Sequence, residues 1–122
     1  MRVSIRAKKF KAWDRKLESF VNLDDYMSEY VGSINDFFYN ADKVDRLSII
    51  QYTGIDDKNG VKIYEWYKVK AIQKATNEEF IGYVTFYNGG YIVRLLEDEG
   101  YYRLDAQQFK YEIVGNIFED KV

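Results

Sequence analysis

Short apolar runs, rich in β-branched and aromatic residues, fill the chain from Leu47 onward. Runs of this kind, when turn residues separate them, are typical of antiparallel strands. The separators here are "TNEE", "NGG" and "EDEG", and "NGG" is a strong hairpin signal. The sequence therefore predicts a mainly β fold with a minor helical part. The predicted strands lie in "LSIIQYT", "VKIYEW", "YKVKAIQK", "FIGYVTFY", "YIVRLL", "YYRL" and "YEIVGNIF".

The C-terminal half carries the densest strand pattern. From about Trp66 we expect five short strands, with one helical turn in "DAQQF" before the last. Five short antiparallel strands suit a small SH3-like barrel or roll. A chain of 122 residues has the length of one domain. We therefore predict a single domain over residues 1–122, with an N-terminal part over about 1–65 and the SH3-like roll over about 66–122.

The N-terminal part predicts a smaller β and helical elaboration. Strand patterns occupy residues 3–7, 9–13 and 17–21, and a turn at "DRK" separates the last two. Between residues 24 and 38, apolar side chains repeat at helical spacing, although Gly32 works against a helix. We expect a short helix in this segment.

Three residue types are absent: the chain has no histidine, cysteine or proline. Their absence removes serine–histidine and cysteine–histidine catalysis, disulfides, and zinc sites built from nitrogen and sulfur. We therefore expect no cofactor, no metal and no enzymatic activity. The first ten residues lack the apolar stretch of a signal peptide, and no apolar run reaches membrane-spanning length. A cytoplasmic location is the simplest expectation.

The stretch "QYTGIDDKNGVKIYE" (51–65) has the look of a ligand loop. As a calcium loop it fails, because Ile55 and Trp66 would occupy two key ligand positions. As a phosphate loop it lacks the second spaced glycine followed by lysine and serine or threonine. Turn chemistry fits better: Asp57, Asn59 and Gly60 suit a type I turn closed by a left-handed glycine. A two-residue primed turn at Asn59-Gly60 is the alternative, and Gly54 ends or bulges the preceding strand.

The same stretch resembles the signature of the YopX-like family of phage and prophage proteins. Two further blocks agree with that family: "KFKAWDRK" (9–16) near the N-terminus and "YEIVGNIFED" (111–120) near the C-terminus. The resemblance implies a mostly β fold with an SH3-like C-terminal roll and a viral or prophage origin. It supplies no reaction.

One departure from the family pattern follows Glu65. The family continues from Ile-Tyr-Glu into Gly-Asp, whereas this chain has Trp66 and Tyr67 there. Under the resemblance, the turn at this point differs from that of its relatives.

An excess of aromatic residues suggests an interaction surface. Tyrosine, phenylalanine and tryptophan make up 18% of the chain, more than one small core needs. We predict a non-enzymatic module that binds a host or phage protein, with self-association as a further expectation. The candidate surface residues are Trp13, Trp66, Tyr67, Tyr83, Tyr87 and Tyr91.

The alternative function is nucleic-acid binding. Residues 1–20 hold seven basic and two acidic side chains, a net charge of +5 in a chain whose total is −2. A basic segment of this kind attracts phosphates, although the remainder of the chain is acidic. The candidate contacts are Lys8, Lys9, Lys11 and Arg15.

A third and weaker hypothesis is an enzyme that uses carboxylates alone. It needs a cleft that holds two or more acidic side chains from Asp56, Asp57, Glu65, Glu97 and Asp98. The run Glu97-Asp98-Glu99 with Asp105 offers oxygen ligands for a hard cation, but such runs are usually solvated turns.

Overall fold

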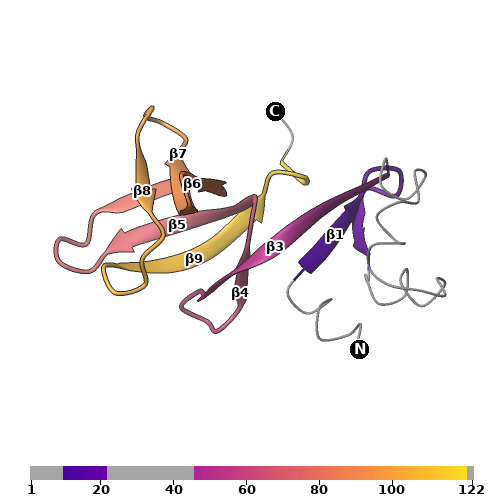
Figure 1. Ribbon diagram of the computed structural model, residues 1–122. Coiled ribbons are helices and arrows are strands. Elements are labelled where there is room, and N and C mark those ends of the chain that lie inside the picture. The colour runs from indigo at the N-terminus through magenta and orange to yellow at the C-terminus, as the bar shows by residue number, and fades with distance from the viewer. Residues whose placement is uncertain (1–9, 22–45, 121–122) are drawn as a thin grey trace. The chain divides into compact units, whose positions relative to one another are not determined.

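The computed structural model describes residues 10–21 and 46–120, and strands joined by turns make up these ranges (Figure 1). The predicted class is confirmed: the described part is mainly β, every strand pairing is antiparallel, and no helix element occurs in it. The predicted strand at 3–7 and helix at 24–38 lie outside the described residues. The strands are β1 (Phe10–Asp14), β2 (Ser19–Val21), β3 (Leu47–Asp56), β4 (Lys62–Tyr64), β5 (Tyr67–Gln73), β6 (Glu79–Tyr87), β7 (Gly90–Leu95), β8 (Tyr101–Arg103) and β9 (Phe109–Asn116).

The chain divides into two compact units, residues 1–51 and 52–122. In the first unit, β1 pairs with β2 and with residues 47–51 of β3. Asp14 is buried at the end of β1, where its carboxylate accepts the backbone N–H groups of Lys16 (2.9 Å) and Leu17 (3.0 Å). Its other oxygen accepts Arg46 Nε at 2.6 Å. This aspartate therefore fixes the β1–β2 turn, and Arg46 neutralises its buried charge.

The second unit begins with a bulged hairpin between the end of β3 and β4. Tyr52 pairs with Tyr64 and Asp56 with Lys62, so β3 has extra residues between two consecutive pairs. Gly54 lies in this bulge at a φ of 89°, in the left-handed region that glycine adopts without strain. Thr53 stabilises the bulge, since its hydroxyl donates to the C=O of Ile63 at 2.8 Å.

The remaining strands form one five-stranded antiparallel sheet in the order β8-β7-β6-β5-β9, which curves into a half-barrel (Figure 1). The five strands predicted from about Trp66 are confirmed by β5 to β9. The "NGG" hairpin is also found: Asn88 and Gly89 both have positive φ between the paired Tyr87 and Gly90. Positive φ at both central positions is the primed turn that matches strand twist.

Alternation along the strands gives this sheet two faces. The core face carries the fully buried Val69, Ala71, Val84 and Val93, together with Phe109 and Tyr111 from β9. The outer face carries Lys68, Lys70, Tyr83, Tyr87, Arg94, Tyr101 and Arg103, which the registers place in cross-strand rows. No helix in the described ranges is long and apolar enough to cross a membrane.

Candidate functional site

The turn between β3 and β4 spans Asp57–Gly60. The N–H of Gly60 donates to the C=O of Asp57 at 3.0 Å, and the N–H of Asp57 donates to the C=O of Val61 at 2.7 Å. Gly60 has a φ of 79°, whereas Asn59 is not among the described non-glycine residues at positive φ. A primed turn needs positive φ at both central positions, so this is a type I turn closed by a left-handed glycine.

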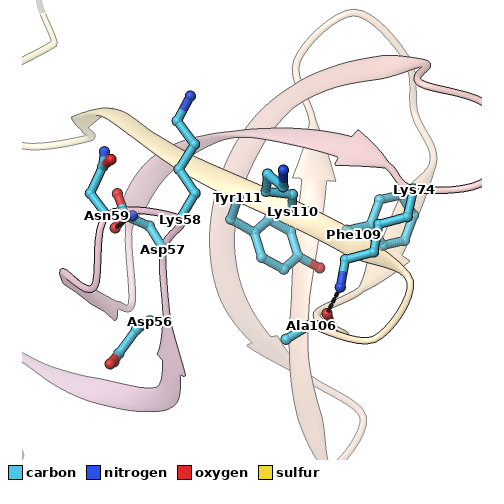
Figure 2. A pocket seen from close by; sticks show the side chains of 9 residues that line it. All are labelled: Asp56, Asp57, Lys58, Asn59, Lys74, Ala106, Phe109, Lys110 and Tyr111. Carbon is cyan, nitrogen blue, oxygen red and sulfur yellow. Dashed lines mark hydrogen bonds between the residues drawn. The ribbon is translucent and has the colours of Figure 1, made fainter.

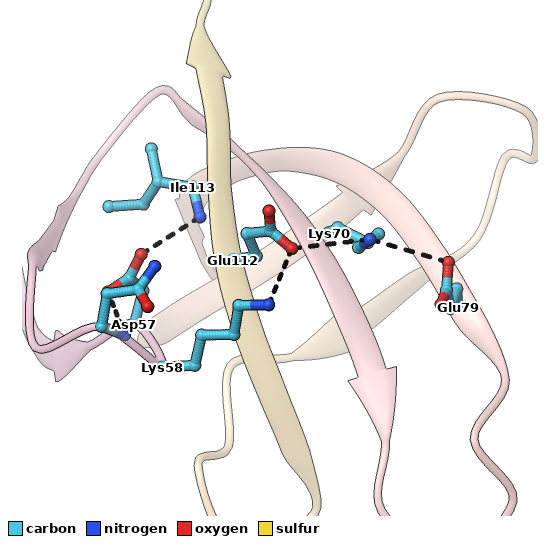
Figure 3. A network of polar contacts seen from close by, with 7 residues as sticks. Asp57, Lys58, Lys70, Glu79, Glu112 and Ile113 are labelled. Atoms are coloured by element: carbon cyan, nitrogen blue, oxygen red, sulfur yellow. Dashed lines mark hydrogen bonds and ion pairs between the residues drawn. The ribbon is translucent and has the colours of Figure 1, made fainter.

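The Asp57 side chain does more than shape this turn. Its carboxylate accepts the N–H groups of Asn59 (2.9 Å) and Val61 (2.9 Å). It also accepts the N–H of Ile113 from β9 at 3.3 Å (Figure 3). Burial alone would raise the pKa of Asp57, but these donors and the Lys58 charge outweigh burial and lower it. The carboxylate is therefore ionised, with oxygens occupied by backbone donors, which suits a structural role.

Lys58 continues the connection between the turn and β9. Its N–H donates to the C=O of Tyr111 at 2.8 Å, and its ammonium lies 3.1 Å from Glu112. Glu112 also pairs with Lys70 at 3.5 Å, and Lys70 lies 3.9 Å from Glu79 (Figure 3). The hydrogen bond from Lys58 and the two lysine charges lower the pKa of Glu112. These groups are partly exposed, so the network orders the edge of β9 more than it stabilises the fold.

Next to this turn lies an open cavity of about 530 Å³, formed between the hairpin tip and the start of β9 (Figure 2). Lys74 Nζ donates to the C=O of Ala106 at 2.8 Å, and the Tyr111 hydroxyl accepts the N–H of Asp105 at 2.8 Å. Burial, more than the neighbouring Asp105 charge, raises the pKa of Tyr111 to about 12. The lining is Asp56, Asp57, Lys58, Asn59, Lys74, Ala106, Phe109, Lys110 and Tyr111.

Two of the five carboxylates named for the enzyme hypothesis line this cavity. Asp56 and Asp57 line the cavity, whereas Glu65, Glu97 and Asp98 do not. Asp56 already accepts the hydroxyl of Tyr52. Within residues 10–21 and 46–120, no three acidic or other metal-ligating side chains form a group that could hold an ion.

Two of the predicted surface aromatics are buried instead. Trp13 packs edge-on against Phe20, with ring centroids 5.0 Å apart, and Tyr67 packs 5.6 Å from Tyr64. Both therefore belong to the packed interior and not to an exposed surface. In β1 both phases carry a large ring, Phe10 in one and Trp13 in the other, so alternation does not distinguish the inward side. In β5 alternation does distinguish it, because Tyr67 is in phase with the buried Val69 and Ala71.

Trp66, Tyr83 and Tyr91 are half-buried. Trp66 has a φ of 65°, and its backbone joins two strands: its N–H donates to Val84 at 2.6 Å, and its C=O accepts Ile117 at 2.8 Å. The Tyr83 hydroxyl donates to Asp120, which also pairs with Lys68 at 3.4 Å. That hydrogen bond raises the pKa of Tyr83.

Tyr87 is the predicted surface residue that is well exposed, at 46%. Its ring contacts that of Tyr101 at 5.5 Å, and the Arg94 guanidinium lies 5.9 Å from it. Arg103 shares this outer face, one row from Arg94. We call these four residues (Tyr87, Arg94, Tyr101 and Arg103) the Tyr–Arg face. Tyr101 and Arg103 were not among the predicted surface residues, because the position of "YYRL" at the edge of the sheet follows from strand order and not from its sequence.

The basic candidates give a mixed picture. Lys8 and Lys9 lie outside the described residues. Lys11 is half-buried, with its ammonium 5.1 Å from the Phe20 ring centroid, and Arg15 is exposed and donates to Ser48 at 2.5 Å. The described basic residues therefore do not form one patch around Trp13, because that ring is buried.

The family of the chain follows from its match to known protein families. The family model described as "YopX protein" matches residues 9–121, nearly the whole chain. The chain belongs to the YopX family. The predicted resemblance is thus confirmed, and the Asp57 turn and β9 both lie within the matched part of this YopX protein.

Solved structures add a likeness in fold. The crystal structure of protein EF1440 from Enterococcus faecalis matches with a TM-score of 0.53 at 20% identity, over 91% of this chain and 93% of that one. At this identity the match concerns the fold alone. The search of curated proteins found no match.

Proposed function

We propose that this YopX protein is a phage- or prophage-encoded accessory protein that binds another protein in the host cytoplasm without catalysing a reaction. The observation that carries the proposal is the Tyr–Arg face. Tyr87 and Tyr101 are 46% and 49% exposed although their rings contact each other. Exposed tyrosine and arginine side chains on a rigid sheet are the residues that most often carry binding energy in protein interfaces.

The rigidity of the sheet supports this function. Each residue of the Tyr–Arg face lies on or at the end of a paired strand, so little backbone conformational freedom is lost on binding. We also assign the five-stranded unit to the SH3-like barrels, which often present aromatic surfaces to proteins. This support for protein binding is an analogy at the level of fold.

Capture from host cells tests the proposal. The full chain is cross-linked in a lysogenic or infected host, and recovered proteins are identified by mass spectrometry for three forms: wild type, Tyr87→Ser with Tyr101→Ser, and Phe86→Ser. Phe86 is exposed and lies next to Tyr87, but its side chain occupies the opposite face of β6. We expect one partner with wild type and Phe86→Ser and its loss with the tyrosine pair. A partner that the double variant retains contradicts the proposal.

Nucleic-acid binding is the second candidate, and the exposed Arg15 near the basic N-terminal end favours it. It predicts a gel shift with single- or double-stranded DNA that weakens steeply with salt. Neutralising Lys8, Lys9 and Lys11 should remove the shift, and an unchanged shift would count against this function.

A further inference from the structure

Strand β8 is the end strand of the five-stranded sheet, paired with β7 on one side. All three of its residues are exposed, and Tyr101 and Tyr102 are 49% and 39% exposed. Natural sheets protect such edges with lysine, proline, bulges or a covering segment, because an open edge pairs readily with another strand. Over β8 the described residues provide no proline, no bulge and no paired neighbour on the second side.

The hydrogen-bond phase of β8 shows which backbone groups face outward. The N–H of Leu95 donates to the C=O of Gly100 at 3.1 Å, and the N–H of Leu104 donates to the C=O of Tyr91 at 3.0 Å. The C=O of Gly100 and the N–H of Leu104 therefore point toward β7. Because direction alternates along a strand, the N–H and C=O groups of Tyr101 and Arg103 point away from β7. No described residue makes a hydrogen bond to them there.

Charges of opposite sign lie at the two ends of β8. Arg103 ends the strand. The turn before β8 carries Glu97, Asp98 and Glu99, all exposed. None of these four side chains forms an ion pair with a described residue. A strand with a positive end, a negative end and an open edge is self-complementary when it meets its own copy in antiparallel orientation.

We propose that β8 pairs with β8 of a second copy of this chain, antiparallel about a twofold axis at Tyr102. In this register Tyr101 and Arg103 of one copy face Arg103 and Tyr101 of the other. Their outward backbone groups are in the right phase, so each pair exchanges both N–H···O bonds. The inference rests on the proposed binding function, and it names the partner of that surface.

The side chains suit the same register. On the outer face, Arg103 lies beside Tyr101 of the second copy, where a guanidinium and an aromatic ring attract each other. The diagonal neighbour of Arg103 is then Glu99 of the second copy, which supplies the missing acidic partner. On the core face, the two Tyr102 rings meet across the axis, next to Phe80 and Phe109, which each Tyr102 already contacts at 4.9 and 5.4 Å.

A nucleic-acid strand is a poorer occupant of this edge. Tyrosine rings and arginines suit stacked bases and phosphates, but the three carboxylates of the 97–99 turn would lie next to the same phosphates. A second copy instead presents its arginines to those carboxylates. A three-residue strand pair buries little surface, so we expect weak association that depends on concentration.

Sedimentation velocity of the full chain over a range of concentrations tests the proposal. We expect a dimer at high concentration, a dissociation constant roughly tenfold higher for Arg103→Glu or Glu99→Arg alone, and recovery in the double variant. Recovery occurs only if the two residues meet across copies. Lys110→Glu is the control, since Lys110 is an exposed cation of β9 without an ion pair to a described residue, and it should leave association unchanged.

A further variant tests the backbone pairing directly and does not rely on a charge swap. Arg103→Pro removes an outward N–H while the bonds of Tyr102 and Leu104 to β7 remain, so the monomer should fold and the dimer should be lost. Circular dichroism checks that each variant is folded. A monomeric wild type at every concentration, or a charge swap that does not restore association, overturns the inference. Capture of a different protein on the Tyr–Arg face, or binding to oligothymidine by a monomer, would also overturn the β8 pairing, because the occupant of the face would be another molecule. Capture of a protein would leave the proposed binding function standing.

Discussion

At the residue scale, Asp57 connects a local turn with a distant strand, because one carboxylate accepts donors from both. Asn59 and Val61 belong to the turn, whereas Ile113 lies on β9, in the C-terminal part of the chain. The turn therefore forms its full set of bonds only when β9 is in place. This couples the hairpin to the five-stranded sheet.

The substitution Asp57→Asn should lower the free energy of unfolding by about 1–3 kcal/mol, because hydrogen bonds to a charged acceptor are strong and the amide nitrogen that replaces Oδ2 cannot accept the N–H of Ile113. The measurement is urea unfolding at neutral pH. Asp56→Asn is the matched control: Asp56 is exposed, and among the described residues its side chain accepts only the Tyr52 hydroxyl, so the loss of stability should be smaller. Equal losses for the two variants would contradict the role of Asp57.

The same carboxylate predicts a pH dependence. The pKa of Asp57 is lowered from its ordinary value of 3.8, so its contribution is present above that pH and is lost as pH falls through the folded value. The stability difference between wild type and Asp57→Asn should therefore shrink below about pH 3.8. Urea midpoints of both proteins along an acid series provide the measurement, and a constant difference would argue against this ionisation.

Trp66 is the second residue whose backbone is informative. A tryptophan at a φ of 65° is strained, because the left-handed region suits glycine. Trp66→Gly should be more stable than Trp66→Ala by about 1 kcal/mol, because only glycine removes the left-handed penalty. Ile81 supplies the control pair: on ordinary strand backbone, glycine should be less stable than alanine. Thermal and urea unfolding of the four variants give the order of stability of glycine and alanine at each site. If alanine is the more stable at both Trp66 and Ile81, the backbone at Trp66 is not strained.

At the element scale, the contact between β6 and β7 depends on Gly82. A Cβ at this position would meet the carbonyl group of Arg94 inside contact distance and lie 2.8 Å from Val93 Cγ1. A paired backbone cannot move away without breaking the ladder, so the sheet requires glycine here.

Gly82→Ala should therefore destabilise the protein by more than about 2 kcal/mol, the range of overpacking in a rigid core. Gly90→Ala is the control on the neighbouring strand. Its Cβ would also meet an atom at 2.8 Å, but that atom is the Arg103 guanidinium, the end of a flexible side chain. Chemical denaturation should show only a small loss in the free energy of unfolding for Gly90→Ala. Comparable losses would mean that the β6–β7 backbone is more adaptable than its geometry indicates.

The elements themselves could be predicted because their signals are local. Alternation and turn residues identified β5 to β9, and "NGG" identified the β6–β7 turn. Burial was harder to predict: Trp13 and Tyr67 were expected on the surface but are buried. Both sides of β1 carry a large ring, whereas in β5 the alternation of Tyr67 with Val69 and Ala71 already indicated the inward side. The Tyr–Arg face was found only in part, since Tyr101 and Tyr87 meet through strand order and not through sequence spacing. Similarly, nothing in "DKNG" points to Ile113.

At the scale of the whole molecule, tyrosines make the stability of the second unit depend on pH in the alkaline range. The pKa of Tyr52 is raised to about 12, chiefly by its hydrogen bond to Asp56, and that of Tyr111 to about 12, chiefly by burial. Tyr64, Tyr83 and Tyr91 are raised as well. Several protons are thus held more tightly in the folded than in the unfolded chain.

This arrangement predicts a loss of stability in alkali. A group whose folded pKa is raised contributes fully below its unfolded value, here 10.0, and the contribution is lost as pH rises through the folded value of about 12. The free energy of unfolding should therefore fall between pH 10 and 12, and the spectroscopic titration of tyrosine should follow unfolding. Tyr111→Phe removes one of these protons, so the stability of that variant should fall less steeply over the same range, even though it starts lower because the Asp105 N–H loses its acceptor. Complete titration of the tyrosines near pH 10 in a protein that stays folded would refute the coupling.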